Sequence, residues 1–159
     1  MGQITSTRIT HLEHQVPRHR QIRFRTRGAS LGLRGTRTAH LVCQIEAGLS
    51  FKALESLAAL SGLSVTGIAS TLGIPERTLA RRREAGRFAP DESERLLRVS
   101  TIFEKAVELF EGDVSGAVTW LTNPKRALGG RTPFAYSRTE VGAREVENLI
   151  GRLEHGVFS

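Results

Sequence analysis

Apolar residues recur three and four positions apart through most of this chain, which is the spacing of one face of a helix. Before about residue 50 they are sparse and show no sustained period. Beyond that point the pattern predicts helices, and no stretch alternates as a half-buried strand does. The predicted helices cover residues 51–61, 64–72, 75–85, 91–110, 113–121 and 137–155, with a short one over 38–47. The sequence therefore predicts an all-α fold.

Capping residues and glycines mark where these helices begin and end. Ser64 and Asp113 are suited to cap helices, and Asp91 with Glu94 and Ser137 with Glu140 have the spacing of capping boxes. Pro75 suits a first helical position. Glycine stops are expected at Gly48, Gly62, Gly73, Gly86 and Gly156. The segment 122–136 is dense in Gly, Pro and Asn and is predicted to be a loop.

Residues 64–85 have the pattern of a helix-turn-helix, in which two short helices meet at a tight turn. The first helix would be the scaffold, Gly73 would take the left-handed conformation, and the second would bury Leu79 and enter a major groove. Candidate DNA-contacting residues on the second helix are Arg77, Thr78, Arg81 and Arg82. Arg83 is the first to exclude, since three successive arginines fan over about 200° of helix. The alternative is that the arginines only form a solvated helix face.

The net charge of +7 is concentrated near the N-terminus, where residues 1–50 carry eight Arg and two Glu. A basic arm of this kind attracts phosphate backbones, although it is equally explained as a solvated tail. Residues 18–37 mix Arg with Gly without a period and are predicted to be linker or arm.

No catalytic constellation stands out, so the chain is predicted to be a non-enzyme without a cofactor. Cys43, the sole cysteine, is expected to be a small buried hydrophobe rather than a nucleophile. His11, His14 and His19 match no standard metal-binding spacing. Without a secretion signal or a membrane-spanning run, we expect a soluble, cytoplasmic protein with no membrane partner.

Several motifs in residues 50–159 occur in an order and spacing that is more specific than any one of them. They are the helix GIPERTLARR, the W-L-x-x-P segment (Trp120, Leu121, Pro124), the loop GGRTPF (Gly129 to Phe134) and the closing GRLEHG (Gly151 to Gly156). In these motifs the chain resembles the Xre/MbcA/ParS antitoxins of type II toxin-antitoxin systems. Phe134 stands where a Leu-like residue is expected in relatives.

The resemblance implies a partner toxin and a DNA site. Antitoxins of this kind are encoded beside a RES-domain toxin, which resembles ADP-ribosyltransferases and attacks NAD. Their C-terminal domain blocks the toxin's nucleotide cleft, and their helix-turn-helix, usually in a homodimer, represses the operon's own promoter. The implied organisation is a basic arm over residues 1–48, partly disordered or dimerising, a helix-turn-helix domain over 49–111 and a toxin-binding domain over 112–159.

The C-terminal segment fits such a role, because a short tail with one apolar anchor can enter a cleft made for a nucleotide. Candidate toxin-binding residues are Arg152, Glu154, His155, Gly156, Val157, Phe158 and Ser159. The alternative is that Phe158 folds back onto the chain's own core and His155 only caps a helix. Pro124, Gly129, Gly130 and Pro133 could contact the partner but are equally explained by turn geometry, and Trp120 is expected in the core instead of at a contact. The runner-up function is a stand-alone helix-turn-helix repressor whose C-terminal part dimerises or senses a ligand.

Overall fold

The computed structural model describes residues 22–34 and 37–156. Within these ranges the regular structure is helical, and the extended pairings are limited to two isolated bridges, Ser50 with Arg87 and Lys125 with Arg131. The all-α prediction is therefore confirmed. The elements are η1 (Ala29–Leu31), α1 (Thr38–Glu46), α2 (Phe51–Ser61), α3 (Val65–Thr71), α4 (Glu76–Ala85), α5 (Pro90–Leu109), α6 (Val114–Thr122), η2 (Arg126–Leu128), α7 (Pro133–Tyr136) and α8 (Glu140–Glu154).

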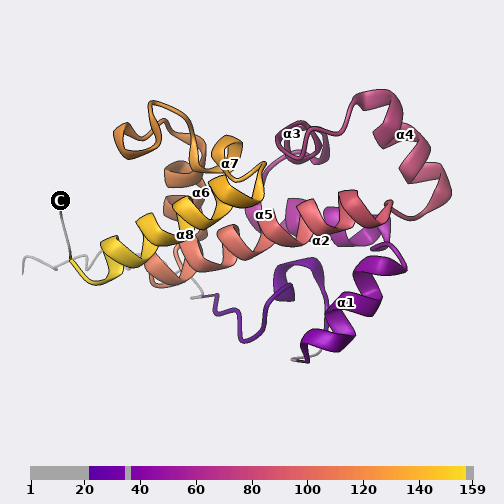
Figure 1. The fold of residues 1–159 in the computed structure, drawn as a ribbon, viewed down its shortest axis with the longest axis horizontal. Coiled ribbons are helices and arrows are strands. Elements are labelled where there is room, and N and C mark those ends of the chain that lie inside the picture. The colour runs from indigo at the N-terminus through magenta and orange to yellow at the C-terminus, as the bar shows by residue number, and fades with distance from the viewer. Residues whose placement is uncertain (1–21, 35–36, 157–159) are drawn as a thin grey trace, which may run out of the picture.

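The 20-residue helix α5 is the centre of the molecule, and α8 runs beside it along the longest axis (Figure 1). The apolar residues of α5 face in several directions because α1, η1, α6 and α8 all pack on this helix. Leu96, Ile102, Phe103, Ala106 and Val107 are completely or almost completely buried. One continuous apolar cluster extends from Leu31 to Ile150, so the helix-turn-helix and the C-terminal helices share a core.

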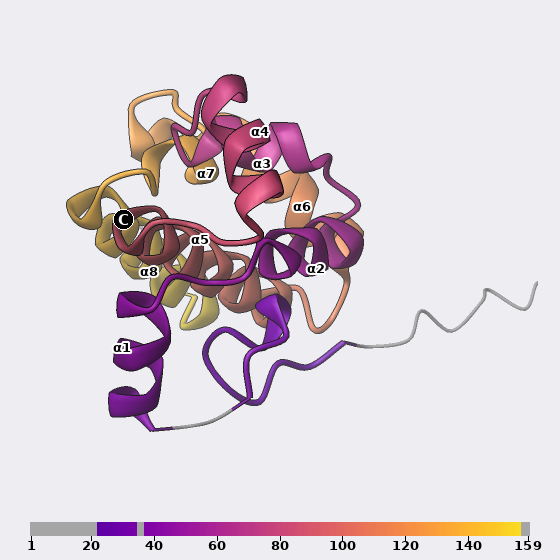
Figure 2. The same cartoon turned by 90° about the vertical axis from the view of Figure 1, so that its right-hand side faces the viewer.

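The segment 22–34 lies against α2 and α5, with its 3-10 helix η1 tucked beneath them (Figure 2). The backbone N–H groups of Gly28 and Ser30 and the Ser30 hydroxyl donate hydrogen bonds to the Glu104 carboxylate, at 3.1, 2.8 and 2.6 Å. The Phe24 and Phe103 rings lie 5.7 Å apart between centroids. This part of the predicted linker or arm is thus packed on the bundle. It lacks a helical period because it is extended, with one 3-10 turn.

Helix ends agree with the predicted caps at Ser64 and Asp113, whose side chains accept hydrogen bonds from the N–H groups of Gly67 and Gly116. The prediction that Asp91 caps α5 is wrong, because the helix already begins at Pro90 and its N-cap is Ala89. A proline is favoured in the first turn, where its missing N–H loses no helical hydrogen bond. Pro75 precedes α4 as its N-cap instead of forming its first residue.

The Ser137 capping box is also wrong. Ser137 ends α7, and its buried hydroxyl donates to the Pro133 carbonyl at 2.7 Å. Thr139 caps α8 instead, accepting from the Gly142 N–H. The predicted loop over 122–136 contains η2 and α7, both too short to show a period in the sequence.

Cys43 is exposed on α1, so the prediction that it is buried is wrong. Only Leu41 is buried on this helix, and the adjacent Val42 is exposed as well. The cause is that α1 packs on α5 through a narrow face. Among the described residues no single helix is long and apolar enough to cross a membrane. Helices α2 and α3, with a bend of 107° between them, are together long and apolar enough, by length and composition only.

Candidate nucleic-acid interface and C-terminal surface

Helices α3 and α4 and the turn between them form the predicted helix-turn-helix. Gly73 in the turn has a φ of +69°, in the left-handed region that the prediction requires. The turn is closed by hydrogen bonds from the Gly73 N–H to the Ser70 carbonyl and from the Ile74 N–H to the Ala69 carbonyl, both 2.9 Å. Arg95 on α5 holds this turn in place by donating a hydrogen bond to the Leu72 carbonyl at 2.8 Å.

Helix α4 lies at one end of the molecule and turns most of its surface to solvent (Figure 1). Leu79 is its buried residue and anchors it to the core, as predicted. Its C-terminal end is held where the Phe51 N–H donates to the Gly86 carbonyl at 2.9 Å. The Arg83 guanidinium lies 5.2 Å from the centre of the Phe51 ring. Arg83 is therefore turned toward α2, in agreement with its exclusion from the groove-facing set.

The four candidate DNA-contacting residues on α4 are not equivalent. Arg77 and Arg81 are exposed and stand one helical turn apart, whereas Thr78 is half-buried. Arg82 is turned toward the start of α5, where its Nε lies 2.7 Å from Glu92 Oε2 and its Nη2 lies 3.2 Å from Oε1. The hydrogen bond with Glu92 raises the pKa of the Arg82 guanidinium. Glu92 could not be predicted as a partner of Arg82 from the sequence, because that pairing depends on how α4 and α5 cross.

The C-terminal surface is built from α6, η2, α7 and α8. Trp120 is half-buried against the core, as predicted, and Lys125 Nζ lies 5.3 Å from the centre of its ring. Desolvation lowers the pKa of the Lys125 ammonium. Gly129 and Gly130 both have positive φ angles, 62° and 79°, so turn geometry accounts for this glycine pair.

The four described candidates for toxin binding lie at the end of α8, at the opposite end of the molecule from α4 (Figure 1). Glu154, His155 and Gly156 are exposed. Arg152 is half-buried, with Nη2 3.4 Å from Glu145 Oε1. His155 is the C-cap, and its backbone N–H donates to the Gly151 carbonyl. The remaining candidates, Val157, Phe158 and Ser159, lie outside the described residues, as do His11, His14 and His19.

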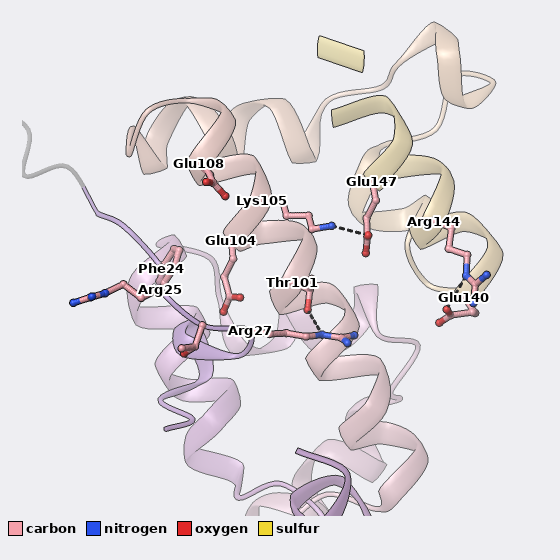
Figure 3. A pocket seen from close by; sticks show the side chains of 11 residues that line it. Phe24, Arg25, Arg27, Thr101, Glu104, Lys105, Glu108, Glu140, Arg144 and Glu147 are labelled. Atoms are coloured by element: carbon pink, nitrogen blue, oxygen red, sulfur yellow. Dashed lines mark hydrogen bonds and ion pairs between the residues drawn. The ribbon is translucent and has the colours of Figure 1, made fainter. Parts of the chain in front are cut away.

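An open, polar cleft of about 470 Å³ lies between residues 24–27, α5 and α8 (Figure 3). Four of its eight charged side chains pair with one another: Lys105 Nζ lies 2.7 Å from Glu147 and Arg144 Nε lies 3.1 Å from Glu140. The hydrogen bond from Arg144 lowers the pKa of the Glu140 carboxyl. In the part of the chain that the structure describes, no group of three His, Cys, Asp or Glu residues could hold a metal ion. We assign no ligand to this cleft.

Two family models match this chain in succession. Residues 40–100 match the antitoxin Xre-like helix-turn-helix domain, and residues 105–156 match the antitoxin Xre/MbcA/ParS C-terminal toxin-binding domain. The first match includes α3, the turn and α4, and the second includes α6 to α8. The family models therefore agree with the placement of the two surfaces.

Whole-chain comparisons give the same result. The chain is 45% identical over 130 residues to an antitoxin Xre of Yersinia enterocolitica, covering 81% of this chain and 88% of the relative. It is 36% identical over 131 residues to an antitoxin Xre of Photorhabdus laumondii, covering 82% and 88%. A third antitoxin Xre, of Pseudomonas putida, is 36% identical over 84 residues, 52% of each chain.

Proposed function

Because the chain belongs to the Xre antitoxin family, with a helix-turn-helix domain and a C-terminal toxin-binding domain, we propose that it neutralises a RES-domain toxin and represses its own operon. In this proposal residues 49–111 bind the operator as a homodimer, and residues 112–159 bind the toxin. The chain itself is not an enzyme. The toxin, in contrast, would consume NAD.

The proposed inhibition of the toxin rests on the exposed end of α8, which lies inside the segment that matches the toxin-binding domain. Glu154 and His155 offer charged and hydrogen-bonding groups at the very end of the helix, and Arg152 precedes them by two and three residues. Valine and phenylalanine follow in the sequence, so the same segment adds an apolar anchor. We propose that these groups enter the toxin's nucleotide site and exclude NAD from it.

The proposed binding of operator DNA rests on the exposed face of α4. Arg77 and Arg81 present two guanidinium groups one turn apart on a helix that is anchored by a single buried leucine. Arginine binds phosphate oxygens and also the O6 and N7 atoms of guanine, so both kinds of contact are open to this face. We propose that α4 enters the major groove.

Co-expression with the proposed toxin, which we expect to be a RES-domain protein encoded next to this chain, tests the proposal. We expect the wild-type chain to restore growth, to preserve cellular NAD and to co-purify with the toxin. A chain that binds promoter DNA but neither restores growth nor co-purifies would instead be the stand-alone repressor. A chain that neutralises the toxin without binding the promoter would disprove only the DNA-binding half.

A further inference from the structure

Arg138, in the short connection between α7 and α8, lies against the turn of the helix-turn-helix. A Cβ atom added to Gly73 would be 2.5 Å from Arg138 Nη2 and 2.7 Å from both Cζ and Nε. The guanidinium thus covers the Gly73 backbone, although the two residues are far apart in the sequence. The C-terminal segment therefore contributes a cation to the surface of the helix-turn-helix.

This cation has no carboxylate partner among the described residues, since none of the ion pairs found there includes Arg138. Arg138 is also exposed. The neighbouring Arg98, in contrast, is paired with both Glu94 and Glu140 and is largely buried. An exposed guanidinium that has no carboxylate partner among the described residues is available to bind an anion.

The backbone beneath Arg138 is held in place by other groups. Arg98 Nη1 donates to the Arg138 carbonyl at 3.4 Å, and Arg98 Nε lies 3.0 Å from Glu140 at the start of α8. On the preceding helix, Phe134 is buried and lines a small apolar pocket together with Ile68 and Thr71 of α3. The side chain of Arg138 is therefore not needed to dock α7 on α3.

The position of Arg138 next to the recognition helix determines which anion it would meet. Gly73 is three residues before Glu76, where α4 begins. In a helix-turn-helix complex the first residues of the recognition helix reach the base edges, so the turn that precedes them lies near a wall of the groove. Phosphates line that wall, and the major groove is only about 12 Å wide.

We propose that Arg138 holds a DNA phosphate beside α4, so that the toxin-binding domain contributes to the DNA interface. The proposal rests on DNA binding by α4, which is itself proposed above. A phosphate contact carries no sequence information, and its loss weakens binding to all sequences alike. Arg138 would thus contribute affinity and orientation, while α4 would contribute sequence preference.

The test measures Kd as a function of salt concentration for the full chain, with a duplex from the chain's own promoter and with a random-sequence duplex. Arg138→Gln should weaken binding to both duplexes severalfold near 0.1 M salt. It should also reduce the slope of log Kd against log salt by about 0.9, the value for one phosphate contact. Arg138→Lys, which keeps the charge, should retain most of the slope.

Two further variants serve as controls. Arg152→Gln removes one positive charge at the opposite end of the molecule, so it should leave the slope unchanged (Figure 1). Arg81→Ala reports on α4 itself. If Arg81→Ala weakens promoter binding while Arg138→Gln binds as the wild type does, the inference about Arg138 is wrong and the proposed function stands. If the wild-type chain binds neither duplex, both are wrong.

Discussion

The guanidinium of Arg82 and the carboxylate of Glu92 form a two-point contact, with Nε 2.7 Å from Oε2 and Nη2 3.2 Å from Oε1. Glu92 also accepts a hydrogen bond from the Ala89 N–H at 2.8 Å, so one carboxylate joins α4 to the first turn of α5. The Glu92 side chain is only 7% exposed. An ionised carboxylate this deep is stable only when its oxygens are paired, and Arg82 provides that pairing. We therefore interpret Arg82 as a positioning residue for α4.

This interpretation predicts a loss of stability when the pair is broken. Glu92→Ala should lower the free energy of unfolding by about 1–3 kcal/mol, because it removes a buried charged partner and the bond to Ala89. Arg82→Ala should also destabilise the chain, and the double variant should be less destabilised than the sum of the two single variants. Urea denaturation of the four proteins measures this coupling. Purely additive effects would show that the contact contributes nothing.

The exposed arginines of α4 should behave in the opposite way. Arg77→Ala and Arg81→Ala should leave the free energy of unfolding nearly unchanged, because neither side chain is buried. Each should weaken promoter binding by about 1–3 kcal/mol if it reads a base, or reduce the salt slope by about one unit if it holds a phosphate. Fluorescence anisotropy over a salt series distinguishes the two cases. Unchanged binding in both variants would place DNA recognition outside this face of α4.

The helix-turn-helix could be predicted from the sequence because its determinants are local. Ser64, Gly73 and Leu79 act within one or two turns of their own positions, through a cap, a left-handed turn and one anchor. The role of Arg82 could not be predicted in the same way, since its partner is on the next helix. The helical period alone was enough to set Arg83 apart among the three consecutive arginines, whereas the pairing of Arg82 follows from the crossing of α4 with α5.

The packing of the N-terminal segment was beyond prediction for a similar reason. Ser30 and Glu104 are 74 residues apart, and neither residue type indicates a buried contact by itself. Arg138 and Gly73 are a second long-range pair of this kind. The C-terminal candidates were suggested by family resemblance, and the structure adds that the described ones lie exposed or half-exposed at the end of α8.

Glu104 should make the stability of the chain depend on pH. Burial raises the pKa of its carboxyl above the ordinary 4.5, against the lowering effect of hydrogen bonds from Ser30 and Gly28 and of the Arg27 charge. The folded chain then binds this proton more tightly than the unfolded chain does. The resulting stability is fully present below 4.5 and is lost as the pH rises through the raised pKa of the folded state.

The measurement is the free energy of unfolding of the wild type and of Glu104→Gln at several pH values from 4 to 8. The wild type should lose stability relative to the variant as the pH rises, by about 1.4 kcal/mol per unit of pKa difference between the folded and unfolded states. Glu108→Gln, an exposed change on the same helix, is the matched control. A constant difference between the wild type and Glu104→Gln over this range would contradict the prediction.

Removal of residues 152–159 should separate the two proposed activities. Val146 and Ile150 are the last residues of α8 that are fully buried, so the truncated chain keeps the contacts that dock this helix on α5. We expect it to bind promoter DNA with nearly the affinity of the full chain, and to lose the ability to restore growth when co-expressed with the proposed RES-domain toxin. Arg152→Ala removes this one side chain, together with its ion pair to Glu145, and keeps residues 153–159, so it shows how much of the loss comes from Arg152 itself. Full neutralisation by the truncated chain would mean that the toxin is bound by another part of the C-terminal surface, because none of the proposed toxin-binding residues at the end of α8 would then be present.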